Sequence, residues 1–119
     1  MKQMIEEVCM AQVGAVRDVK EEWGGAIRFT VGGKMFAMLG QNRNGDDIVT
    51  LKCAPEKVEQ YRHDFSSVVQ GYYMNKTHWN SVLLQDSDVP TEVMEQMIGH
   101  SYACVVAGLP KKVRESLIL

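Results

Sequence analysis

Side chains that could bind or react gather in residues 71–80, whose sequence is GYYMNKTHWN. This window combines aromatic rings with amide, imidazole and ammonium groups to an extent that no other window of the chain matches. It is therefore our candidate functional surface. The side chains that form it are those of Tyr72, Asn75, Lys76, His78 and Asn80.

Catalysis would need an activated base or nucleophile, and His78 is the residue to consider. The chain has no GxSxG motif, no thiol with a histidine close in sequence and no distinctive pair of acids. A histidine that hydrogen-bonds a turn suits the amides and backbone around His78 better than a general base does. We therefore expect no catalytic residue and no enzyme activity.

Metal binding is not indicated either. The histidines are far apart, with neither HxxxH nor HExxH spacing, and the cysteines form no CxxC pair. Apolar neighbours predict that the cysteines are buried, reduced thiols. The six residues are His63, His78, His100, Cys9, Cys53 and Cys104. We expect no metal and no cofactor.

Basic side chains could neutralise the phosphates of a nucleic acid. The net charge is −2, so any such binding must come from a local patch. The candidate nucleic-acid-binding residues are Arg28, Lys34, Lys52, Lys76, Lys111, Lys112 and Arg114. Tyr72, Tyr73 or Trp79 could stack on bases. The alternative is a solvated sheet face with the aromatic rings packed in the core.

The elements that must position these residues begin with a helix over residues 2–12, which Gly14 ends. Residues 16–25 are charged and irregular. Alternation predicts strands over 26–31 and 34–39, and Gly32-Gly33 between them indicates a tight hairpin. A polar loop over 40–47 leads to a third strand over 48–53.

The second half begins with a helix from Pro55 to about His63, whose N-cap, Ala54, offers no capping oxygen. Residues 65–70 form a link, and residues 79–84 form a strand. In that strand we expect Trp79 to face the core and Asn80 to face the other way. The longest helix runs from Pro90 to Gly108, before a basic turn over 111–114 and an apolar tail over 117–119.

This order of elements predicts an α+β fold, with helices covering one face of an antiparallel sheet. The length of 119 residues suggests a single domain over 1–119. The N-terminus has no apolar signal core, and no apolar run is long enough to span a membrane. We expect a soluble, cytoplasmic protein with no membrane partner.

Several motifs occur together in a recognisable order. They are FTVGGKMFA at 29–37, LKC at 51–53, GY at 71–72, NKTHWN at 75–80, SY at 101–102 and LPKK at 109–112. In order and spacing the chain resembles the MmcQ/YjbR family over nearly its whole length. It departs from the family pattern at Ala54 and at residues 20–25, where an acidic or hydroxyl residue and a proline-containing turn are usual.

The resemblance implies a fold like that of the frataxin/CyaY group, with the second sheet face more open. It also implies DNA binding, which is a common label in the family. The frataxin likeness raises an iron site on scattered acids as a lesser alternative, with candidates Glu6, Glu7, Asp18, Glu21 and Glu22. Our first hypothesis is a small non-enzymatic DNA-binding module. The alternative is an adaptor that binds a protein or small ligand through the open sheet face and residues 75–80.

Overall fold

A computed structural model describes residues 1–72 and 74–117. Tyr73 and the last two residues of the predicted tail, 118 and 119, lie outside the described residues. Four α-helices are α1 (Lys2–Ala11), α2 (Pro55–Asp64), α3 (Thr91–Ala107) and α4 (Lys111–Ser116). Six strands are β1 (Val16–Lys20), β2 (Ala26–Val31), β3 (Lys34–Gln41), β4 (Asp47–Lys52), β5 (Val68–Gln70) and β6 (Trp79–Leu83), with a 3-10 turn, η1 (Glu21–Trp23).

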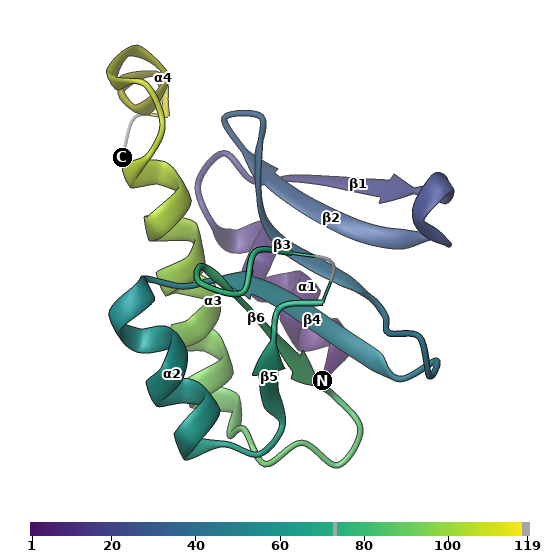
Figure 1. The fold of residues 1–119 in the computed structure, drawn as a ribbon. Coiled ribbons are helices and arrows are strands. Elements are labelled where there is room, and N and C mark those ends of the chain that lie inside the picture. The colour runs from purple at the N-terminus through teal and green to yellow at the C-terminus, as the bar shows by residue number, and fades with distance from the viewer. Residues whose placement is uncertain (73, 118–119) are drawn as a thin grey trace.

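The strands form one antiparallel sheet in the order β1-β2-β3-β4-β6-β5. The core lies on one face of this sheet, where α1 and α3 pack on the strands with apolar side chains such as Ile5, Phe29 and Ile98. We call this the helix face and the opposite one the open face. Figure 1 shows α1 behind the sheet and the segment that follows β5 passing in front of it. The predicted α+β class, with helices on one face, is confirmed.

The hairpin between β2 and β3 turns at two glycines with positive φ, 57° at Gly32 and 80° at Gly33. Val31 and Lys34 pair directly across the turn. Only glycine adopts this backbone at two successive positions without a steric cost. The hairpin prediction is therefore confirmed.

A β-bulge in β3 gives α3 a polar connection to the sheet. The register of β2 and β3 shifts at Phe29, so that Thr30 pairs with Met35 and leaves Phe36 as the extra residue. Ser101, which is fully buried on α3, donates its Oγ proton to the Phe36 carbonyl at 2.5 Å. The same Oγ accepts the Lys52 amide proton at 2.8 Å. The serine thus satisfies two backbone groups, one on β3 at the bulge and one at the end of β4.

The helix starts follow the sequence closely. α2 begins at Pro55, and its N-cap Ala54 makes no side-chain cap hydrogen bond, as expected. α3 begins at Thr91 with Pro90 as its N-cap, one residue later than predicted, and Gly108 ends it. No helix within residues 1–72 and 74–117 is long and apolar enough to cross a membrane.

Three local predictions are wrong. Residues 16–20, predicted to be irregular, form the edge strand β1, whose Val16 and Val19 are exposed. Residues 68–70, predicted to be part of a link, form the short strand β5. Cys9 and Cys53 are buried as expected, but Cys104 is only half-buried.

Candidate functional site

Residues 71–72 and 74–78, called here the segment after β5, lie across the open face before the chain enters β6 (Figure 1). The Gly71 amide donates to the Trp79 carbonyl at 3.0 Å, and the next amide, that of Tyr72, donates to Ser81 Oγ at 2.8 Å. The Tyr72 hydroxyl accepts the backbone N–H of Arg43 at 2.8 Å. The segment is therefore bound to the sheet at its start and covers part of the open face.

This cover explains polar burial on the open face. Thr50 and Ser81 face away from the helices, yet they are 0% and 1% exposed. Their hydroxyl oxygens lie 2.8 Å apart, so one hydroxyl donates to the other, and Ser81 Oγ also accepts the Tyr72 amide proton. The open face is consequently less open than the family resemblance implied.

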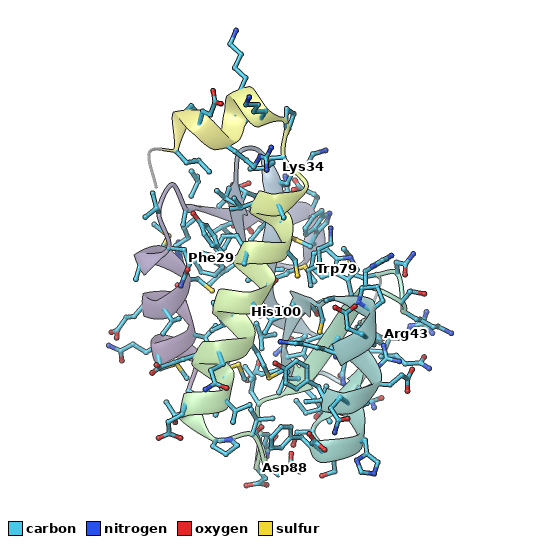
Figure 2. The ribbon with its side chains drawn as sticks, turned by 90° about the vertical axis from the view of Figure 1, so that its left-hand side faces the viewer. Phe29, Lys34, Arg43, Trp79, Asp88 and His100 are labelled. Carbon is cyan, nitrogen blue, oxygen red and sulfur yellow. The ribbon has the colours of Figure 1, made fainter. Side chains whose placement is uncertain are left out.

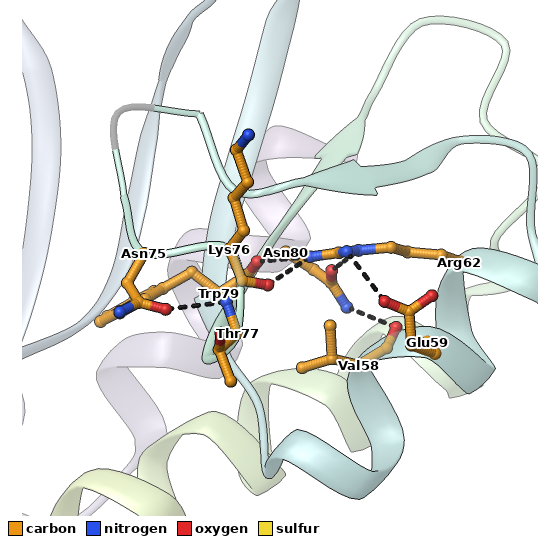
Figure 3. Close-up of polar contacts among 8 residues, drawn as sticks. All are labelled: Val58, Glu59, Arg62, Asn75, Lys76, Thr77, Trp79 and Asn80. Atoms are coloured by element: carbon orange, nitrogen blue, oxygen red, sulfur yellow. Dashed lines mark hydrogen bonds and ion pairs between the residues drawn. The ribbon is translucent and has the colours of Figure 1, made fainter.

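The end of the segment is held from the other side by Arg62 of α2, whose side chain is only 15% exposed. Figure 3 shows the guanidinium between α2 and the turn before β6. Arg62 Nε donates to Asn80 Oδ1 at 2.7 Å, and Nη2 donates to the carbonyls of Lys76 at 2.7 Å and Trp79 at 3.2 Å. Asn80 Nδ2 donates in turn to the Val58 carbonyl at 3.3 Å. A fork of donors suits these acceptors because the guanidinium is planar and always charged.

The prediction for the two faces of β6 is wrong. Asn80 is 1% exposed and faces α2, whereas Trp79 is half-buried and lies on the open face, opposite Lys52 of β4. Alternation separated the two residues correctly. The choice of the large aromatic ring as the core member failed because Arg62 and the Val58 carbonyl give the buried amide of Asn80 hydrogen-bond partners on both its oxygen and its nitrogen.

The five predicted surface residues therefore differ in role: some hold the segment in place, and others stay available to a partner. Asn75 Oδ1 accepts the Thr77 N–H at 2.7 Å and so forms the turn, while Tyr72 and Asn80 are engaged as described above. Lys76 is exposed, and Figure 3 shows its side chain pointing away from the guanidinium. His78 is half-buried, and its carbonyl accepts the Cys53 amide proton at 2.7 Å. Lys76 has its ammonium free for a partner, with no ion pair within residues 1–72 and 74–117.

The predicted basic residues fall into two groups. On the open face, Arg28 is paired with Asp18 at 2.7 Å, and Lys52 and Lys76 lie further along the sheet. At one end of the molecule, Lys34 lies close to α4, as Figure 2 shows. We call this second group the basic end, and its members are Lys34, Lys111, Lys112 and Arg114.

Apolar contacts bring the basic end together. A Cβ on Gly32, at the hairpin tip, would lie 2.8 Å from Leu109 Cδ1 and 3.0 Å from Val113 Cγ1. A Cβ on Gly14 would lie 2.7 Å from Leu117 Cδ2. Leu109, Val113 and Leu117 recur every four residues, from just before α4 to its C-cap, so the apolar side of this region rests on these two glycines. Its charged face is left in solvent, where Lys112 and Arg114 have no ion-pair partner among the described residues.

A cleft of about 600 Å³ on the open face was not foreseen from the sequence. Its walls come from η1, from β3 and from the segment after β5. The lining residues are Glu22, Trp23, Gly24, Ala26, Met35, Met38, Gly40, Gln41 and Met74. Alternation along β3 does place Met38 on the open face. No sequence signal pairs that face with Trp23 and Met74, because both come from irregular segments.

Groups that titrate or bind metals show no reactive arrangement in the described part of the chain. No three His, Cys, Asp or Glu side chains within residues 1–72 and 74–117 are placed to hold a metal ion. Burial raises the pKa of Cys9 to about 12 and that of Cys53 to about 11, which keeps both as thiols. Burial, then nearby Lys57, lowers the pKa of His100, and its Nε2 accepts the Ala54 amide proton at 3.1 Å.

The chain is similar to several proteins of bacteria. The model of the YjbR family matches residues 11–104. "Uncharacterized protein YjbR" of Escherichia coli strain K12 is 33% identical over 112 residues, which cover 94% of this chain and 92% of that protein. "Uncharacterized protein YbdF" of Escherichia coli O157:H7 is 34% identical over 84 residues, or 71% of this chain and 67% of that protein.

Two crystal structures share the fold. Deinococcus radiodurans protein DR2400, described as a DUF419 domain, has a TM-score of 0.81 at 28% identity and covers 97% of this chain and 86% of its own. A Pseudomonas syringae protein has a TM-score of 0.76 at 22% identity, over 87% of this chain and 97% of its own, which shows the fold alone. The likeness to frataxin and CyaY stays a prediction. The family match and the relatives together show that this chain belongs to the YjbR family, as its motifs indicated.

Proposed function

We propose that this chain is a small, non-enzymatic module that binds DNA through the basic end. The observation that supports the proposal is the meeting of the β2–β3 hairpin with α4, which places Lys34 near Lys111, Lys112 and Arg114. Lys111 Nζ forms an ion pair with Glu115 Oε1 at 3.9 Å. Both side chains are largely in solvent, so the pair is weak. Three to four cations therefore face solvent together.

The basic end suits this role better than the open face does. Arg28 already forms an ion pair with Asp18, and Lys52 and Lys76 stand apart from the cations at the hairpin tip. The net charge of the chain is −2, so its affinity for DNA must come from the few phosphate contacts that a local basic patch can make. About three contacts, each contributing roughly 0.9 to the slope of log K against log salt, predict a slope of about −3.

The test is fluorescence anisotropy with a short, labelled, mixed-sequence duplex over a series of salt concentrations. Lys112→Ala should weaken binding to all sequences alike and shrink the slope by about 0.9. The matched control is Lys57→Ala, because Lys57 is also exposed and without an ion pair among the described residues but lies on α2. Lys76→Ala tests the predicted contribution of residues 75–80 in the same way.

Two results would end this proposal. One is the absence of binding at the lowest salt concentration. The other is an equal loss of affinity in Lys112→Ala and Lys57→Ala, which would show a response to net charge alone and no local site.

The second candidate is ligand binding on the open face, and the cleft beside Trp23 and Met38 favours it. Its volume of about 600 Å³ lies within the range of roughly 300–1,000 Å³ that is usual for small-molecule sites. The two functions use different surfaces, so each is tested on its own residues.

A further inference from the structure

The cleft on the open face has a soft, apolar lining. Met35 and Met38 come from β3, Met74 from the segment after β5 and Trp23 from η1. Thioether side chains adapt their shape and pack well against flat rings, and an indole offers an aromatic face. Gly24 and Gly40 also line the cleft and add no side chain there. The lining therefore fits a flat, apolar body.

Two cations stand next to this lining, beside the Trp23 ring, although neither lines the cleft itself. The guanidinium carbon of Arg28 is 5.9 Å from the centroid of the Trp23 ring, and Lys20 Nζ is 5.5 Å from it. Arg28 is also the direct cross-strand neighbour of Met38, so its side chain starts from the same face. The one acid in the lining, Glu22, is already paired with Lys20 at 3.0 Å.

Arg28 also has a hydrogen-bond donor that lacks an acceptor. Its Nη2 donates to Asp18 at 2.7 Å, but its Nε is buried and has no acceptor among residues 1–72 and 74–117. A buried donor without a partner carries a free-energy cost that a suitable acceptor would remove. Trp23, which packs near it, is 49% exposed and precedes two glycines with positive φ and open space around them. Use of this donor by a ligand therefore requires η1 to shift so that an acceptor reaches Nε.

We propose that the cleft binds a small organic anion with a flat, aromatic body. The body packs against Met35, Met38, Met74 and the Trp23 indole, and the carboxylate or sulfonate faces Arg28 and Lys20. This inference rests on the second candidate function, ligand binding at the open face, and is independent of DNA binding at the basic end. It adds the chemical class of the ligand and the residue that selects it.

Two fluorescent probes with the same ring system test this class. They are 8-anilino-1-naphthalenesulfonate, which is anionic, and N-phenyl-1-naphthylamine, which is neutral. The anion should bind saturably with one molecule per chain and about ten-fold more tightly than the neutral probe, as expected for one charge-assisted hydrogen bond. Arg28→Met should reduce this preference to about one, and Arg28→Lys, which lacks Nε, should restore only part of it.

Met74→Ala should weaken both probes alike because it removes apolar lining without touching the cation. The matched control is Met10→Ala, since Met10 is 43% exposed on α1 and lies outside the cleft lining. It should leave both affinities unchanged.

The outcomes distinguish the ligand class from the site itself. Saturable binding without preference for the anion would overturn the proposed ligand class but leave ligand binding at the open face intact. Non-saturable binding, or equal losses in Met74→Ala and Met10→Ala, would overturn the site itself. Arg28 lies outside the basic end, so the Arg28→Met protein should bind duplex DNA as tightly as the unaltered chain in every case.

Discussion

Arg62 holds the turn before β6 against α2, and Arg62→Ala would remove this connection. The substitution deletes hydrogen bonds to Asn80 Oδ1 and to the carbonyls of Lys76 and Trp79. Hydrogen bonds from a charged donor contribute about 1.5–3 kcal/mol each, and an acceptor that water can reach recovers much of that. Asn80 is 1% exposed, so water does not reach its Oδ1 without rearrangement.

These terms predict the size of the effect. The unsatisfied Asn80 acceptor contributes about 1–3 kcal/mol, and the two backbone carbonyls add about 1 kcal/mol between them after hydration. The pair with Glu59, at 3.4 Å with the carboxylate 84% exposed, contributes little. We expect Arg62→Ala to lower the free energy of unfolding by about 3 kcal/mol.

Equilibrium unfolding in urea, followed by circular dichroism, measures this change. Glu59→Ala is the matched control and should change stability by less than about 0.5 kcal/mol. Arg62→Lys should recover less than half of the loss, because an ammonium group cannot donate to three acceptors in a fixed fork. Since Asn80 and Arg62 share one contact, Arg62→Ala combined with Asn80→Ala should cost less than the sum of the two single changes.

The reasoning would be refuted by an Arg62→Ala protein within about 1 kcal/mol of the unaltered chain. Strict additivity of the two substitutions would refute it as well, because it would mean that the side chains do not interact.

Three further predictions concern other parts of the molecule. Gly32→Ala should cost about 2–3 kcal/mol in urea unfolding, since its Cβ would meet Leu109 at 2.8 Å, whereas Gly33→Ala, with open space around it, should cost only about 1 kcal/mol from its positive φ. Hydrogen bonds, first from the backbone N–H of Ser67, lower the pKa of Asp88 from 3.8 to about 2. The folded-state pKa is depressed, so Asp88 stabilises the fold above its ordinary pKa and loses that contribution as the pH falls towards 2; Asp88→Asn should flatten the stability profile in that window. In labelling with a thiol reagent at mildly alkaline pH, half-buried Cys104 should react first and Cys9, whose pKa burial raises to about 12, should react last.

The fold was largely predictable because its strongest signals are local. The paired glycines at 32 and 33 required one backbone conformation, and the apolar stripe of α3 required one buried face. β1 escaped prediction because an edge strand need not alternate, and its two valines are exposed. β5 escaped because three residues are too few to show a period.

The site was less predictable because its residues meet only in three dimensions. The window at 71–80 was correctly singled out as unusual, but much of its polarity serves to bind the segment to the sheet. Alternation cannot say which face of β6 the helices cover. The burial of Asn80 depends on Arg62, which is eighteen residues away in the sequence, and no fixed pattern links the two. The cleft likewise needs η1 and the segment after β5 to converge on β3.

Ser101 has a consequence for how α3 and the sheet come together. An apolar helix face on an apolar sheet can shift by one helical turn at a modest cost in free energy, because hydrophobic contacts are not directional. Here one hydroxyl fits only where Phe36 offers a carbonyl and Lys52 an amide, so sliding would leave both backbone groups and the buried hydroxyl without these partners. The bulge and the serine together favour one position of α3 on the sheet over others that would bury a similar apolar area. Sequences that keep the fold should therefore change the bulge and this small polar residue together or not at all.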